Sequence, residues 1–106
     1  MSEISIWPKT INEAVELMID TMSDIDKTEL LNTKQEDLYR FQYSLGMLIG
    51  GLFGLYNGNK ALLEACAHTR KNEIERLLML SDPEKASWII IEAIWKRLKA
   101  DMKVPV

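Results

Sequence analysis

The placement of glycine constrains this chain more than any other feature of its sequence. All five glycines fall within thirteen residues, and four recur at intervals of four: Gly46, Gly50, Gly54 and Gly58. The surrounding stretch, residues 41–59, carries no charged side chain. Three such glycines inside a helix cost roughly 3 kcal/mol relative to alanine. We therefore expect another group to approach this backbone closely and to compensate for that cost.

Capping residues and apolar spacing predict an all-α fold, a compact bundle of four to five helices in a single domain over residues 1–106. Residues 1–9 are expected to form an extended lead-in and residues 102–106 a flexible tail. Three pairs with capping-box spacing predict helix starts: Thr10 with Glu13, Thr33 with Glu36, and Asn72 with Glu75. Asn59 predicts a further start as an N-cap, and Asp82-Pro83 predicts another through a proline at the first helical position.

Between the first two predicted helices, residues 23–32 are polar and turn-like, although Leu30 and Leu31 are expected to dock on the core. The central helix is expected to extend to about Tyr56, with Gly58 as its left-handed cap. A loop is predicted over residues 67–71, where the apolar stripe is lost.

The helix after Asn72 carries four large apolar residues: Ile74, Leu77, Leu78 and Leu80. In the final predicted helix, Trp88 and Trp95 lie seven residues apart, and this spacing favours a helix over a strand for the isoleucine run 89–91.

Composition narrows the class of protein. With 13 basic and 16 acidic side chains the net charge is −3, and no clustered basic stripe predicts a nucleic-acid partner. A single cysteine and the absence of a secretory signal lead us to expect a soluble, cytoplasmic protein. The continuous apolar run 45–55 is only about half of the roughly 20 residues that a membrane span needs, so no span is predicted.

The glycine stripe itself has three interpretations. A pair of membrane-spanning helices is excluded because the apolar run is too short to cross a bilayer. A phosphate-binding loop fails because no strand precedes it and Lys60 is not followed by Ser or Thr. Close packing of helices remains, either within the chain or between chains. The residues predicted for a contact surface are Gly46, Gly50, Gly51, Gly54, Trp88 and Trp95.

The inventory of reactive side chains is small. Cys66 and His68 are two residues apart, so on a helix their side chains point away from each other and do not form a nucleophile–base pair. One histidine and one cysteine cannot supply a structural zinc site unaided, and the carboxylates mostly occupy helix-capping positions. We therefore predict no catalytic, cofactor-binding or metal-binding residue, and no cofactor.

Three sequence segments together resemble a family of small bacterial helical domains of unknown function. They are Leu45-Gly46-x-x-Ile49, Phe53-Gly54-Leu55-Tyr56-x-Gly58-Asn59 and Asp82-Pro83-Glu84-Lys85-Ala86-Ser87-x-Ile89-Ile90. The resemblance covers Trp7 to Leu98 and implies a compact helical domain, without an assigned reaction, cofactor or partner. Gly50-Gly51 replaces an Arg-Asn pair of the family pattern, and Tyr56 replaces a Trp. A binding role of that Arg-Asn pair therefore does not transfer to this chain.

Two classes of function remain open. The favoured class is a non-enzymatic interaction or regulatory module that binds a protein partner or a second copy of itself through the Gly-rich helix or the Trp face. The alternative is a small-ligand binder or enzyme with a pocket between helices near Tyr56, Asn57, His68 and Trp95.

Overall fold

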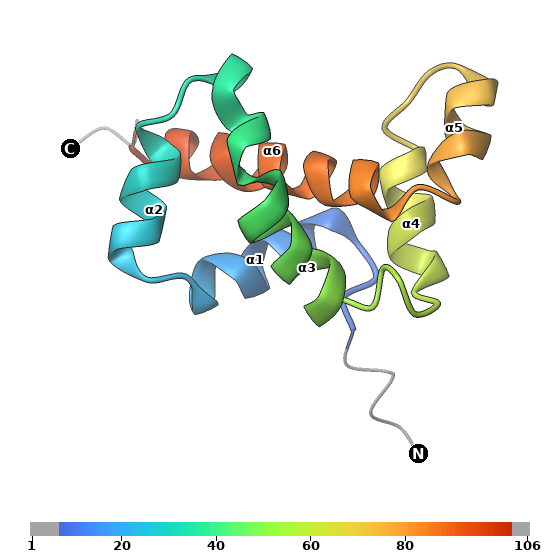
Figure 1. Ribbon diagram of the computed structural model, residues 1–106, viewed down its shortest axis with the longest axis horizontal. Coiled ribbons are helices and arrows are strands. Elements are labelled where there is room, and N and C mark those ends of the chain that lie inside the picture. The colour runs from blue at the N-terminus through green and yellow to red at the C-terminus, as the bar shows by residue number, and fades with distance from the viewer. Residues whose placement is uncertain (1–6, 103–106) are drawn as a thin grey trace.

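A computed structural model describes residues 7–102, and all regular structure in this range is helical (Figure 1). The α-helices are α1 (Ile11–Thr21), α2 (Asp24–Leu31), α3 (Met47–Leu52), α4 (Lys60–Ala67), α5 (Glu73–Met79) and α6 (Pro83–Met102). These are six where four to five were predicted. Between α2 and α3 lie a 3₁₀-helical segment, η2 (Gln35–Phe41), and a π-helical segment, η3 (Gln42–Gly46). Most of the predicted lead-in 1–9 and tail 102–106 falls outside the described residues.

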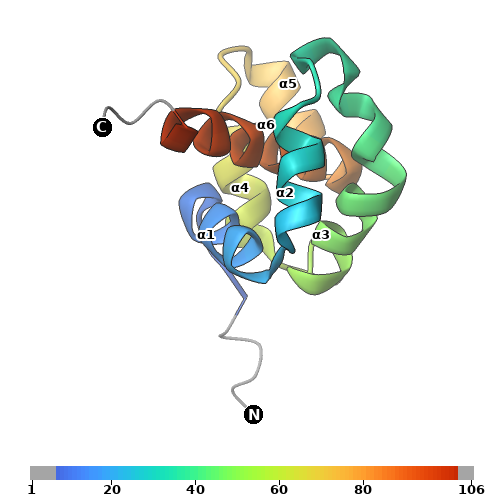
Figure 2. The ribbon, with the colours of Figure 1, turned by 90° about the vertical axis from the view of Figure 1, so that its left-hand side faces the viewer.

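Helix α6 is the central helix of the fold. It contacts every other helical element of the described chain, and Figures 1 and 2 show the other helices gathered around it. Three consecutive residues, Ile89, Ile90 and Ile91, are buried, as expected for a helix that is covered on several sides. The prediction of a helix for this isoleucine run is confirmed. The Asp82 carboxylate caps the helix by accepting the Lys85 N–H at 3.1 Å.

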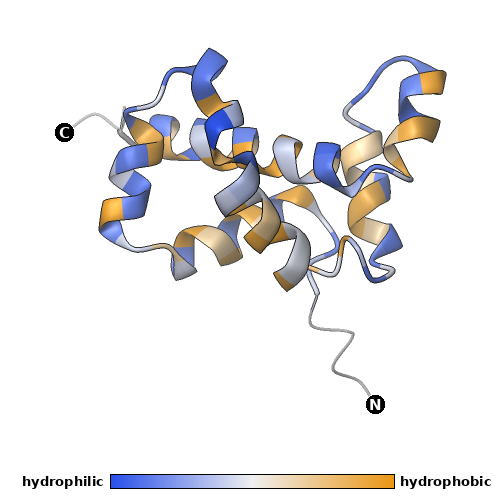
Figure 3. Cartoon of the chain, viewed as in Figure 1, coloured by the Kyte–Doolittle hydropathy of each residue, from blue (hydrophilic) through white to orange (hydrophobic). Residues whose placement is uncertain are grey.

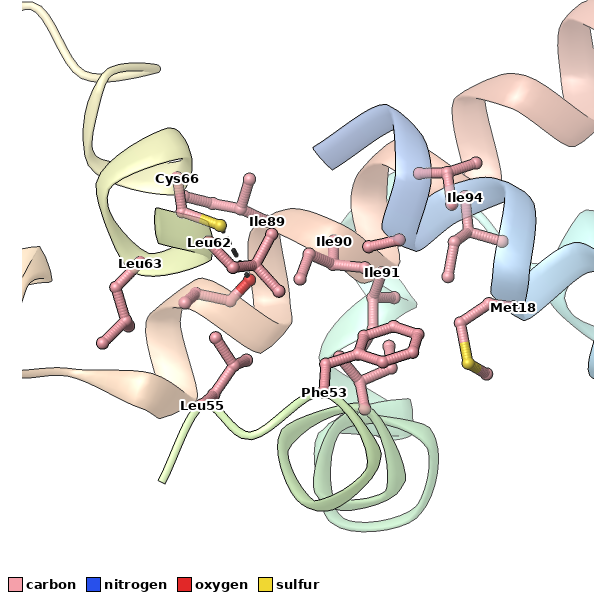
Figure 4. Close-up of a cluster of buried hydrophobic side chains, with 14 of the residues drawn as sticks. Met18, Phe53, Leu55, Leu62, Leu63, Cys66, Ile89, Ile90, Ile91 and Ile94 are labelled. Atoms are coloured by element: carbon pink, nitrogen blue, oxygen red, sulfur yellow. Dashed lines mark hydrogen bonds between the residues drawn. The ribbon is translucent and has the colours of Figure 1, made fainter. Parts of the chain in front are cut away.

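One continuous core joins the six α-helices. Each of them contributes at least one buried apolar side chain, and the strongest contributions come from α1, α4 and α6. Figure 4 shows Phe53 and Leu55, from the chain that leaves α3, together with Leu62 of α4 around the isoleucines of α6. A chain of this length can bury enough surface to be stable without a disulfide or a metal ion.

The additional helix is α2, which replaces the turn predicted for residues 23–32. Ser23 caps it by accepting the Asp26 N–H at 3.1 Å. The carboxylates of Asp24 and Asp26 lie in the first turn, where they interact favourably with the positive end of the helix dipole. Only Leu30 of this helix is fully buried, with Leu31 partly buried, so both leucines reach the core as predicted. The helix was missed because its single buried position gives almost no apolar periodicity.

The central helix predicted from Thr33 is divided into η2, η3 and α3. The predicted capping pair of Thr33 and Glu36 is wrong: the Thr33 hydroxyl donates to the Glu29 carbonyl at 2.8 Å, and Lys34 occupies the N-cap position without a side-chain bond. A change from 3₁₀ to π geometry alters the number of residues per turn. A fixed 3.6-residue period therefore could not describe this segment.

Gly54, and not Gly58, ends the central segment. Helix α3 stops at Leu52, and Gly54 follows with a left-handed φ of +70°. The Leu55 N–H then reaches back to the Gly50 carbonyl at 3.0 Å, which closes the helix in a Schellman arrangement. Gly58 is also left-handed, with a φ of +104°, but it lies in the following turn.

The other predicted helix starts are confirmed. Thr10, Asn59 and Asn72 each accept backbone N–H groups of the helices that they precede. The carboxylate of Glu13 departs from the ideal capping box, since it accepts the N–H of Lys9 at 2.9 Å. The loop predicted for residues 67–71 agrees within one residue with the connection between α4 and α5.

Candidate functional site

The chain itself covers three of the four regularly spaced glycines. A Cβ atom on Gly46 would lie 3.5 Å from the Ile91 side chain of α6. A Cβ atom on Gly50 would overlap the Tyr56 ring, and one on Gly54 would overlap the Trp7 ring. The close approach predicted for this stretch therefore occurs within the chain at Gly50 and Gly54, whereas the contact at Gly46 is an ordinary van der Waals contact.

Gly51, like Gly58, has no heavy atom within 4 Å of a Cβ built there. It belongs to an exposed surface along η2, η3 and α3 that we name the central face. Its large side chains are all about half exposed or more: Tyr39, Tyr43, Met47, Leu48, Leu52 and Tyr56. Ser44 and Gly51 are the exposed small residues of the same face. Of the glycines predicted for a contact surface, Gly46, Gly50 and Gly54 are thus covered within the chain and Gly51 is exposed.

A cavity of about 850 Å³ lies beside the central face, between α2 and the central segment. Its apolar lining comes from Met22, Leu30, Phe41, Leu45 and Leu48. Asp26 and Glu29 line it from α2, and Arg40 lines it from η2. Because Ser44 and Leu48 belong both to this cavity and to the central face, the two features form one continuous site.

The two tryptophans predicted for the contact surface are half-buried and pack against the core. The indole N–H of Trp95 donates to the Thr33 carbonyl at 2.8 Å, and the Lys99 ammonium lies 5.2 Å from the centre of the ring. Trp95 thereby anchors the end of α2 on α6, and both residues serve contacts within the chain.

The predicted alternative is a pocket between helices near Tyr56, Asn57, His68 and Trp95. None of these four residues lines the cavity beside the central face, the cavity next to Trp7 and Pro8, or the hollow beside Ile25. His68 is exposed at the end of α4, where its Nδ1 contacts the Glu64 carbonyl at 2.7 Å. Trp95 bonds at the far end of α6, beside Thr33.

Cys66 is an apolar core residue with a weak hydrogen bond. It is fully buried, and its thiol donates to the Ala86 carbonyl at 3.7 Å (Figure 4). Burial raises the pKa of the thiol from 9.0 to about 12, because the thiolate would lose its hydration. Since the thiolate is the nucleophilic form, this residue is unsuited to covalent catalysis.

We expect Cys66 to react with iodoacetamide at pH 8 at least about a hundred-fold more slowly in the folded protein than in the urea-unfolded chain, because the thiol is both inaccessible and protonated. Mass spectrometry of timed samples measures this ratio. Equal rates would show that the thiol is open to solvent.

The raised pKa of Cys66 also predicts how the free energy of unfolding changes at alkaline pH. The unfolded thiol, with its lower pKa, ionises first as the pH rises above 9. The stability tied to this group is therefore complete below pH 9 and is lost between pH 9 and about 12. In Cys66→Ala, this contribution to the slope of unfolding free energy against pH should be absent.

A second exposed apolar cluster lies on α5. Ile74, Leu77 and Leu78 are 67%, 69% and 61% exposed, and Leu80 follows at 40%. Only Met79 of this helix is buried. Figure 3 shows apolar residues along α5, which lies at one end of the molecule. Large apolar side chains gathered on a protein surface mark interaction sites.

A comparison with known families adds the chain's classification. The model of a family described as a domain of unknown function (DUF6794) matches residues 7–98. The chain belongs to this family. The match confirms the resemblance to a family of unknown function and covers the same span, Trp7 to Leu98. No curated protein and no solved structure matches the chain.

Within the described part of the DUF6794 domain, no helix combines the length and apolar character needed to cross a bilayer. Over the same residues, no group of three or more His, Cys, Asp and Glu side chains is gathered as a metal ion would require.

Sequence reasoning missed the aromatic and apolar part of the central face. Tyr39, Tyr43 and Met47 recur every four residues, but this spacing alone does not show whether the row faces the core or the solvent. Of the predicted glycines in this segment, Gly46 and Gly50 are buried and only Gly51 belongs to the central face. The cavity could not be found from the sequence, because α2 forms one of its walls and that helix was not predicted.

Proposed function

We propose that this DUF6794 domain is a non-enzymatic protein-interaction module of the bacterial cytoplasm that binds a protein partner through its central face. The observation that carries the proposal is the exposure of six large apolar or aromatic side chains on the central face, five of which lie in the uncharged stretch from Phe41 to Asn59.

The composition of the central face supports a protein partner. Aromatic residues and methionine are enriched in protein interfaces, and charged residues are depleted at interface centres. The central face exposes three tyrosines and a methionine: Tyr39, Tyr43, Tyr56 and Met47. The stretch from Phe41 to Asn59 carries no charged side chain. Nucleic acid would instead require a basic surface. Gly51, with open space above it, lets the backbone of a partner helix approach closely.

The cavity beside the central face gives the surface a place for an inserted side chain. Its volume of about 850 Å³ exceeds that of any single side chain, and Arg40, Asp26 and Glu29 line it together with the apolar residues. Interface anchors characteristically fill such pockets. A partner helix on the central face could place an aromatic or aliphatic residue there, with polar groups directed at the rim.

A second candidate function, the binding of a small molecule, has its support in the same cavity. The volume lies within the roughly 300–1,000 Å³ of ordinary ligand sites. Native mass spectrometry of the protein purified from its own cell distinguishes the two: a stoichiometric small molecule favours a ligand binder, whereas a co-purifying protein favours the interaction module.

Met47→Glu is expected to remove the co-purified partner, because a carboxylate at the centre of the face would be buried without a counter-charge. Met47 is 60% exposed, so the fold should be retained, as circular dichroism would show. Tagged wild-type and variant proteins would be recovered from the native cell and their bound proteins compared by quantitative mass spectrometry.

Ile25→Glu provides the matched control, since Ile25 is a 78% exposed apolar residue on α2, outside the central face. It should retain the partner. If both variants keep every protein bound by the wild type, the central face is not the docking surface.

A further inference from the structure

Given the proposed function, on which this inference rests, we propose that Met47 is a reversible oxidation site that controls binding at the central face. A hydroperoxide converts the Met47 thioether to a sulfoxide, and the polar sulfoxide releases the protein partner. Reduction of the sulfoxide restores binding. The domain would thereby couple its partner to the oxidant level around it.

Met47 stands apart from the other methionines by its accessibility. Its side chain is 60% exposed, whereas Met18 and Met79 are 1% and 2% exposed in the core. Met22 is half-buried and lines the cavity beside the central face. Among the methionine side chains that the structure describes, Met47 is therefore the most open to a soluble oxidant, and oxidation at sulfur follows exposure.

The thiol of the chain does not compete for the same oxidant. Cys66 is fully buried, and burial raises the pKa of its thiol to about 12. The thiolate, which is the form that peroxide oxidises readily, is therefore not formed near neutral pH. Mild peroxide should act first on Met47 and leave the sulfur atoms of the core unchanged.

The oxidation is a two-electron transfer of one oxygen atom. A lone pair of the Met47 sulfur attacks one oxygen of hydrogen peroxide, so that an S–O bond forms and the O–O bond breaks. The proton of the transferred hydroxyl joins the leaving hydroxide, which departs as water. The sulfur is oxidised and the peroxide is reduced. An apolar, flexible side chain thereby becomes a polar and chiral one.

The surroundings of Met47 allow the free domain to tolerate the added oxygen. Ser44 and Gly51, three residues before it and four residues after it, are exposed small residues of the central face. No heavy atom lies within 4 Å of a Cβ built on Gly51. Water can therefore hydrate the sulfoxide, and we expect the fold and its free energy of unfolding to stay the same.

The same oxygen becomes unfavourable when a partner covers the central face. In the chain, Met47 lies between the first two large side chains of this face and the last three. A partner seated on them would remove water from the sulfoxide and offer it few hydrogen-bond donors, because interface centres are mostly apolar. A buried acceptor without a donor is costly, so the affinity should fall at least about ten-fold.

A peroxide time course followed by peptide mass spectrometry tests the site. In the folded domain, Met47 should oxidise at least about ten-fold faster than Met18 or Met79. In the urea-unfolded chain the three rates should become equal. Equal rates in the folded domain would contradict the assignment of Met47. A marked loss of stability on oxidation of Met47 alone, measured in urea, would show that the oxygen acts through the fold and would also contradict it.

Recovery of the partner tests the control of binding. The tagged domain is oxidised, freed of peroxide and then presented to an extract of the native cell. Oxidised wild type should hold at least about ten-fold less partner than untreated wild type. Treatment with reductases for both sulfoxide epimers should restore the partner. Retention of the partner by wild type that is fully oxidised at Met47 would overturn the proposal.

Met47→Leu is the matched control, because it keeps an apolar side chain of similar volume and every other methionine of the chain. It should hold the partner both before and after peroxide. Loss of the partner from peroxide-treated Met47→Leu would place the sensitive group elsewhere and overturn the proposal.

The oxidation site and the proposed function fail in different ways. If untreated wild type holds no protein that Met47→Glu loses, the proposed function is wrong, and the control by oxidation is wrong with it. If Met47→Glu loses a protein that fully oxidised wild type keeps, the central face binds the partner and only the control by oxidation is wrong.

Discussion

Asn59→Ala is expected to destabilise the fold by about 3 kcal/mol, measured as the free energy of unfolding in urea. Asn59 is buried, and its side-chain amide donates to the Phe53 carbonyl at 2.7 Å and to the Pro8 carbonyl at 2.9 Å. Its oxygen accepts the Leu62 N–H at 3.2 Å. Alanine would leave three backbone groups without this partner, each at a cost of about 1 kcal/mol or more.

Asn72→Ala is the matched control for Asn59→Ala. Asn72 caps α5 in the same way, by accepting two backbone N–H groups, but it is exposed, and water can replace its bonds. The expected loss is about 1 kcal/mol, the usual value for an N-cap. Equal losses for the two variants would mean that the bonds from Asn59 to Pro8 and Phe53 add nothing to capping.

Gly54→Ala should lower stability by at least about 2 kcal/mol, whereas Gly51→Ala should raise it by up to about 1 kcal/mol. Gly54 has a φ of +70° and the Trp7 ring against its α-carbon, so a methyl group there meets both backbone strain and a steric overlap. Gly51 lies in α3 with open space around it, and alanine at that position removes only the entropic cost of glycine.

Urea denaturation of the two glycine variants in parallel measures the sign of both changes in the free energy of unfolding. The difference in tryptophan fluorescence between Gly54→Ala and the wild type gives a second readout, since displacement of the Trp7 ring from Gly54 would expose it. If Gly54→Ala proved as stable as the wild type, Trp7 would not be fixed in this contact. If Gly51→Ala were destabilised in the isolated domain, the surface above Gly51 would be occupied in solution.

Local signals in the sequence were sufficient for the all-α class and for most helix starts. A hydroxyl or amide at Thr10, Asn59 and Asn72 acts on N–H groups two or three residues away, so its role can be recognised without knowledge of the fold. The Asp82-Pro83 helix start and the buried isoleucines of α6 were also predictable from local sequence. The first depends on adjacent residues, and the second on the apolar character of one long helix.

Long-range contacts decided the features that could not be predicted. Asn59 was recognised as a cap, but its bond to Pro8 joins residues 51 positions apart and leaves no local pattern. The Gly54 contact with Trp7 is equally distant. For α5, apolar spacing correctly indicated a helix, yet the same spacing cannot distinguish a face turned to the core from one turned to solvent. The central face was hidden by the same ambiguity.

The position of α6 in the chain has a consequence for how the domain is made. Every other helical element packs on residues 83–102, which the ribosome synthesises after all of those elements. Until this helix emerges, the earlier helices lack the element on which all of them pack, and a growing chain in that state is prone to association. Completion of the core is therefore tied to the end of the domain's own translation, and the segments that form the central face and α5 are exposed to the cell before the domain folds.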